Sequence, residues 1–168
     1  MRYTPAALAL AMLAAVTASS GFSAPAVPLD PRAAALVQAG RAALVAGQVD
    51  DAVADFEAAL ALQPGHVAIY LNLAEAARKQ DMQGKALHYY RVALKLDPNN
   101  QYAIAGEGEA LVEKGAVEKA KKNYDRLVAL CGSNCAAARS LASAIARGPA
   151  KQVVSAEQVK PKPEVTSN

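Results

Sequence analysis

The chain has little of the material that usually fills a protein core. Phe, Tyr and Trp together make up 5% of its 168 residues, tryptophan is absent, and there are only two cysteines. Hydrophobic residues nevertheless account for 53% of the chain, so alanine and leucine must supply most of the packing. Side chains of this kind favour closely packed helices over a β-sandwich.

The chain also lacks a strong excess of charge of either sign. Its formal net charge at pH 7 is +3, and its lysines and arginines are scattered along the sequence. Proteins that bind nucleic acid or an anionic membrane surface concentrate basic residues in patches or stripes. We therefore expect neither nucleic acid nor a membrane among the partners.

Motifs that carry catalysis are missing as well. The sequence contains no glycine-rich phosphate loop and no G-x-S-x-G pattern. Its two histidines, His66 and His88, stand apart, and the acidic pair Asp50–Asp51 is typical of a helix start. We expect a protein that is not an enzyme and that holds no cofactor and no metal.

The first residues have the layout of a secretory signal. Arg2 precedes the apolar run AALALAMLAAV at 6–16, and small residues follow it. This run is shorter than the roughly 20 residues that span a bilayer, which argues against a membrane anchor. We predict a signal peptide over 1–26, cleaved after Ala18 or after Ala26, and an exported protein whose favoured compartment is the periplasm.

A repeat follows the signal. Pro64 and Pro98 lie 34 residues apart in similar phrases, and a third related phrase comes 34 residues later. The spacing divides the chain into copies at 33–66, 67–100 and 101–134. Each copy holds two stretches with apolar residues at helical spacing. A turn residue separates the two stretches in every copy: Gly47, Asp81 and Gly115.

Three series of residues recur in register. Small residues form two of them, at Gly40, Ala74 and Gly108 and at Ala52, Ala86 and Ala120. Aromatic residues form the third, at Phe56, Tyr90 and Tyr124. Small residues allow paired helices to approach closely, and the aromatic ring fills the space beside the contact.

This pattern resembles the tetratricopeptide repeat family. The second copy has nearly all of the family's marked positions: Tyr70, Leu73, Ala74, Ala77, Ala86, Tyr90, Ala93 and Pro98. The third copy departs from the pattern with Leu127 and Gly132. The resemblance implies an all-α fold, a right-handed α-solenoid of three helix–turn–helix units with a C-terminal capping helix. An alanine-rich three-helix bundle is the alternative.

Further signals set the limits of the domain. Asp30 and Pro31 form a helix start, with Asp as the N-cap and Pro at the first helical position. The amphipathic stretch 136–147 predicts the helix that covers the third copy. We therefore predict a repeat domain over 31–147 and a disordered tail over 148–168, which has no apolar period.

The two cysteines lie at the corner between the third copy and the predicted capping helix. Cys131 and Cys135 bracket the sequence CGSNC, where the other copies have proline. Export favours a structural disulfide here. A redox-active pair, free thiols and metal binding remain alternatives, although a metal would need further ligands and the histidines belong to other copies.

The resemblance also implies a concave groove that binds an extended peptide or a partner helix. The matching positions are Val37, Arg41, Leu71, Asn72, Glu75, Arg78, Lys79, Tyr102, Ala105, Glu109 and Glu113. Some family members hold a chaperone's C-terminal carboxylate with Lys, Asn and Arg, but this chain has Val37 and Arg41 where they have Lys and Asn. We do not expect that kind of ligand.

The expected function is that of a non-enzymatic adaptor that binds a protein or peptide partner in the cell envelope. The alternative is a structural module that associates with further copies of itself as a homo-oligomer. The repeat pattern is compatible with both.

Overall fold

The computed structural model describes residues 28–149. The predicted signal segment, 1–26, and all but the first two residues of the predicted tail lie outside the described residues. Within the described range the chain forms seven helices: α1 (Pro31–Val45), α2 (Val49–Leu62), α3 (Val67–Lys79), α4 (Gln83–Leu96), α5 (Gln101–Glu113), α6 (Val117–Cys131) and α7 (Ala136–Arg147).

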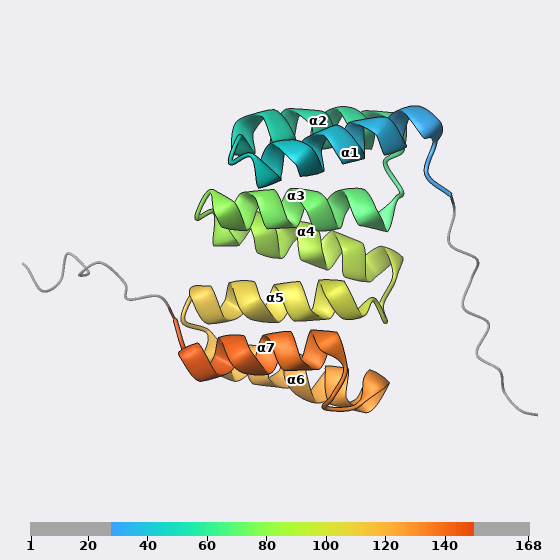
Figure 1. Ribbon diagram of the computed structural model, residues 1–168. Helices are drawn as coiled ribbons and strands as arrows, with labels where there is room; N and C mark the ends of the chain where they lie inside the picture. The colour runs from blue at the N-terminus through green and yellow to red at the C-terminus, as the bar shows by residue number, and fades with distance from the viewer. Residues whose placement is uncertain (1–27, 150–168) are drawn as a thin grey trace, which may run out of the picture.

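The helices stack as pairs in chain order. α1 packs on α2, α3 on α4 and α5 on α6, each pair contacts the next, and α7 covers α5 and α6 (Figure 1). Residues 28–149 contain no strand. The predicted all-α solenoid is therefore confirmed. None of the described helices is both long and apolar enough to cross a bilayer.

Short polar side chains begin several helices. The Asp30 side chain accepts a hydrogen bond from the backbone N–H of Arg32, with Pro31 in the first turn of α1. At the start of α5, Asn100 accepts one from the backbone N–H of Ala103. These bonds satisfy amide groups that would otherwise have no partner within the helix.

The turn residue of each pair has left-handed backbone geometry. Gly47, Asp81 and Gly115 have φ values of 77°, 56° and 83°. Glycine adopts this region without steric cost, and Asp tolerates it better than most residues. The recurrence of these residues at one position in the sequence thus reflects one backbone shape that joins the two helices of each pair.

Two apolar clusters form the core, and α3 contributes to both. The N-terminal cluster contains Phe56, Ile69 and Leu73, while the C-terminal cluster is built around Ile104 and Leu141. Fully buried alanines line the helix crossings: Ala52, Ala59, Ala86, Ala93 and Ala120. The small side chains let the helices approach closely, so a few large residues suffice to fill the remaining space.

Candidate functional site

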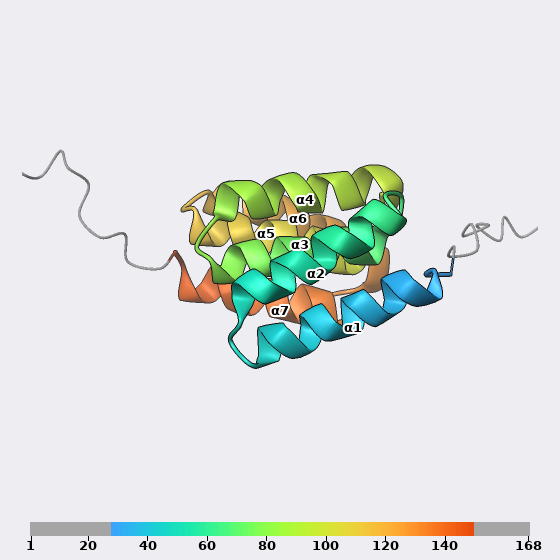
Figure 2. The same cartoon turned by 90° about the horizontal axis from the view of Figure 1, so that it is seen from above.

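One face of the solenoid is hollowed. α1, α3, α5 and α7 lie side by side on it (Figure 1), and seen from above α1 and α7 project beyond α3 and α5 (Figure 2). The main hollow, of about 500 Å³, is lined by Arg41, Leu71, Asn72, Glu75, Arg78, Tyr90, Tyr102, Ala105, Gly106, Glu109, Ala136, Ala137 and Ser140.

A second hollow, of about 300 Å³, adjoins the main hollow toward the C-terminal ends of α5 and α7. It shares Arg78 and Glu109 with the main hollow. Its other lining residues are Val112, Glu113, Ala144, Arg147, Gly148 and Pro149. The two hollows together therefore follow the concave face from α1 to the end of α7.

The main hollow has a largely apolar lining. The Tyr90 ring reaches it from α4 because Gly106 of α5 has no side chain in its way; a Cβ there would overlap the ring. Tyr102 stands at the first turn of α5 with 74% of its surface exposed. An aromatic ring held open to solvent in this way offers apolar contact area at a small entropic cost.

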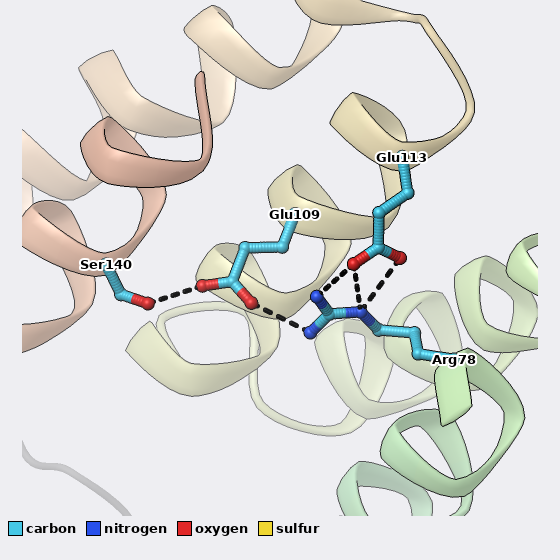
Figure 3. A network of polar contacts seen from close by, with 4 residues as sticks. All are labelled: Arg78, Glu109, Glu113 and Ser140. Carbon is cyan, nitrogen blue, oxygen red and sulfur yellow. Dashed lines mark hydrogen bonds and ion pairs between the residues drawn. The ribbon is translucent and has the colours of Figure 1, made fainter. Parts of the chain in front are cut away.

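A network of polar side chains joins three helices across the concave face (Figure 3). Arg78 of α3 binds Glu109 of α5, with 2.7 Å between Nη1 and Oε2, and its Nε lies 3.1 Å from both carboxylate oxygens of Glu113. A further contact joins the Arg78 Nη2 to Glu113. Ser140 of α7 donates to Glu109 Oε1 at 2.5 Å. All three guanidinium nitrogens of Arg78 therefore bind the protein's own carboxylates.

Burial and neighbouring charge have opposite effects on the pKa of Arg78. Burial lowers its pKa, but the hydrogen bonds that Arg78 donates to Glu113 and the nearby negative charge outweigh this effect, so the pKa lies above its ordinary value. Burial raises the pKa of the neighbouring Tyr90, although Arg78 acts in the opposite direction. At neutral pH the hollow thus presents a cationic Arg78 and a neutral Tyr90 hydroxyl.

The other end of the main hollow carries a second arginine with a different partner. Arg41 of α1 donates from Nε to Oδ1 of Asn72 at 2.9 Å, and Asn72 donates to the backbone carbonyl of Ala68 at 2.6 Å. No carboxylate pairs with Arg41 among the described residues. Within the same range, the exposed Glu75 on α3 has no ion-pair partner either.

Most of the residues predicted to form the groove lie together. Eight line the main hollow: Arg41, Leu71, Asn72, Glu75, Arg78, Tyr102, Ala105 and Glu109. Glu113 lines the second hollow, and the exposed Lys79 lines neither. The prediction for Val37 is wrong, because Val37 is only 5% exposed and packs in the N-terminal cluster.

Sequence patterns alone missed five lining residues. Tyr90 belongs to the second helix of its copy, and Gly106 matters only because that ring reaches it. The others are Ala136, Ala137 and Ser140, which α7 brings to the hollow. The amphipathic pattern of 136–147 predicted a covering helix, but nothing in it indicated that its first turns would also line the groove.

The cysteines lie where α6 meets α7. The structure joins Cys131, the last residue of α6, to Cys135, which precedes α7. The disulfide therefore fixes the start of the helix that completes the main hollow. Across residues 28–149, no three His, Cys, Asp or Glu side chains gather in a way that could hold a metal ion.

Comparison with known proteins agrees with the repeat of helix pairs. A tetratricopeptide repeat family model matches residues 37–101. The tetratricopeptide repeat domain-containing protein PYG7 of Arabidopsis thaliana, a chloroplast protein, is 39% identical over 56 residues, which make up 33% of this chain and 19% of PYG7.

Solved structures share the fold. The tetratricopeptide repeat domain of Sgt2 from Aspergillus fumigatus is 23% identical, with a TM-score of 0.63 over 77% of this chain and 93% of that one. The first such domain of RPAP3, bound to the HSP90 peptide SRMEEVD, is 23% identical, with a TM-score of 0.61 over 73% and 98%. The TPR2B domain of yeast Sti1, in a complex with pHsp70, is 18% identical, with a TM-score of 0.65 over 70% and 96%.

The family match, the register of the three copies and the shared fold agree. Residues 28–149 therefore have the fold of a tetratricopeptide repeat array, and the family model matches residues 37–101 of it.

Proposed function

We propose that this protein is a non-enzymatic adaptor that binds an extended segment of a partner protein in its main hollow. The observation that carries the proposal is the exposed Tyr102 beside the apolar lining of that hollow. The RPAP3 domain, which has the same fold, is bound to a peptide. A hollow of about 500 Å³ has the size of a site for a few side chains.

The ligand should differ from the acidic HSP90 peptide bound by the RPAP3 domain. Glu109 and Glu113 already bind all three guanidinium nitrogens of Arg78, so its charge is paired before any ligand carboxylate arrives. Arg41 is the remaining cation of the main hollow, and it can serve one acidic group. A segment with an apolar anchor against Tyr102 therefore fits better than a run of acids.

Two substitutions test the binding hypothesis, because one should affect partner binding alone and the other should affect stability alone. Tyr102→Ala should abolish capture of envelope proteins by the immobilised chain while its Tm stays unchanged. Ala86→Leu should do the reverse: the larger side chain overpacks a fully buried helix crossing at a cost of about 1–3 kcal/mol.

Leu96→Ala is the matched control, because Leu96 is 46% exposed on α4 and lines neither hollow. Capture that survives Tyr102→Ala, or is lost equally in Leu96→Ala, would refute the groove as the working surface.

We further propose that the chain is exported to the periplasm. Support comes from the basic, apolar and small-residue order of 1–26. The test is the mass of the N-terminal peptide from the envelope fraction. A start at residue 19 or 27 agrees with export, whereas an intact Met1 in a cytosolic fraction contradicts it.

Self-association is a second candidate. Its support is limited to two exposed apolar residues of the first helix pair, Val45 (91% exposed) and Leu62 (43% exposed), which lie at opposite ends of that pair. Sedimentation at rising protein concentration distinguishes the two functions, because an adaptor that acts alone stays monomeric.

A further inference from the structure

The two hollows lead to the point where the described chain ends. Arg78 and Glu109 line both of them, and the second hollow ends at Gly148 and Pro149. These are the last two described residues. Whatever follows Pro149 therefore starts at the edge of the concave face.

The remaining chain is long enough to reach every part of that face. Residues 150–168 are 19 residues, and 19 extended residues span roughly 60 Å. Neighbouring packed helices lie about 8–10 Å apart, so the path from α7 across α5 and α3 to α1 is roughly 30 Å. The segment can cross the whole groove without being fully extended.

The charges of the segment match the unpaired charges of the main hollow. Arg41 and Glu75 lack an oppositely charged partner among residues 28–149, whereas Arg78 is engaged. The segment KQVVSAEQVK at 151–160 has both signs of charge, with valines between them. Its valines can pack on Tyr102, its lysines can reach Glu75 and its glutamate can reach Arg41.

We propose that residues 150–168 occupy the two hollows of their own chain, so that a partner must displace them. This regulation deepens the proposed function, and it rests on the proposal that the concave face binds extended peptides. An internal ligand is present at a high effective concentration, so even weak contacts suffice to hold it. A partner then displaces the segment only if its concentration divided by its Kd exceeds the effective concentration of the segment divided by the segment's own Kd.

Photo-crosslinking of the full chain tests this directly. A photoreactive amino acid replaces Val154, and peptides joined to it after illumination are identified by mass spectrometry. We expect cross-links to residues of α5 and α7 that line the hollows, within a single chain and with a yield that is independent of protein concentration. The same photoreactive residue at Lys122 on α6, a helix that lines neither hollow, is the positional control.

A charge variant tests the recognition. Glu75→Lys should lower the cross-link yield, whereas Asp125→Lys, the same reversal of charge on an exposed site of α6, should leave it unchanged. Cross-links scattered over the surface, or equal yields in both variants, would overturn the proposal. Products of two chains, with a yield that falls on dilution, would overturn it in favour of docking onto a second copy.

No external partner enters this experiment. Failure of Tyr102→Ala to affect partner capture would count against the proposed function alone. Absence of cross-links from Val154 to the hollows would count against the internal ligand alone.

Discussion

Three helical positions require glycine, because a large side chain of a neighbouring helix packs against the backbone there. A Cβ on Gly40 would lie 2.5 Å from the Phe56 ring, and one on Gly108 would lie 2.6 Å from Leu141. Gly106 faces the Tyr90 ring in the same way. At each crossing a large side chain rests directly on the backbone of the next helix, so the absence of a side chain is itself part of the packing.

Gly106→Ala should lower the free energy of unfolding by about 1–3 kcal/mol, because the added methyl group must displace Tyr90. Gly84→Ala, also on a helix but facing open space, should instead raise it by about 0.4–1 kcal/mol through the entropy of the unfolded chain. Urea unfolding of the two variants measures the difference. Equal effects would show that the contact at Gly106 relaxes freely.

The raised pKa of Tyr90 predicts a loss of stability in alkali. An unfolded tyrosine loses its proton near pH 10, and buried Tyr90 loses it only at higher pH. Between these values the unfolded state binds fewer protons, so the free energy of unfolding falls as the pH rises above about 10. Tyr90→Phe should show a shallower fall over this range than wild type. Parallel curves would contradict the assignment.

Single residues were the hardest to predict from sequence. The family resemblance placed both Val37 and Arg41 in the groove, but Val37 packs into the N-terminal cluster and only Arg41 is exposed. Likewise the sequence showed that Arg78, Glu109 and Glu113 belong to facing helices. Their mutual pairing depends on the distance between the helices and on side-chain rotamers, and residue spacing in the sequence predicts neither.

Each helix depends on its neighbours, and α7 shows this most clearly. Leu141 is fully buried against Gly108 of α5, while Ser140 one residue earlier reaches Glu109. One side of α7 thus covers the core and an adjoining part lines the hollow. A helix that caps the array therefore also shapes the surface proposed to bind the partner.

Removal of the disulfide between α6 and α7 should lower the free energy of unfolding. Closing the short loop between Cys131 and Cys135 constrains the unfolded chain by about 2 kcal/mol in the entropy model. The double variant Cys131→Ala, Cys135→Ala should lose about that much free energy of unfolding in urea. Reductant should reproduce the loss in wild type and leave the double variant unchanged. A wild-type protein insensitive to reductant would contradict a stabilising bond.

Helices and their turns were predictable because their signals are local. The three turn residues recur at one period, and the structure gives all three the same left-handed backbone. Buried alanines recur at the same period for the same packing reason. The groove required contacts between copies, and its lining from α4 and α7 had no local signal.

Across the array, two cores that share α3 imply unequal stability along the chain. α1 and α2 have a neighbour on one side only, so we expect them to open without the rest. Ile104→Val, in the C-terminal core, should then lower hydrogen-exchange protection in α7 by about 0.5–1.5 kcal/mol and leave α1 unchanged.

Ile69→Val, in the N-terminal core, is the matched control and should lower protection in α1, because the opening of α1 and α2 loses that contact. A fall in α1 protection caused by Ile104→Val would indicate a single cooperative unit.

The two glycines of α5 have a consequence for how the chain folds. Each costs an isolated helix about 1 kcal/mol relative to alanine, and a 13-residue helix is already marginal in water. α5 therefore depends for its helicity on the contacts that Tyr90 from one side and Leu141 from the other make with its bare backbone. The helix at the middle of the array would be disordered as an isolated peptide and takes its shape from the helices around it.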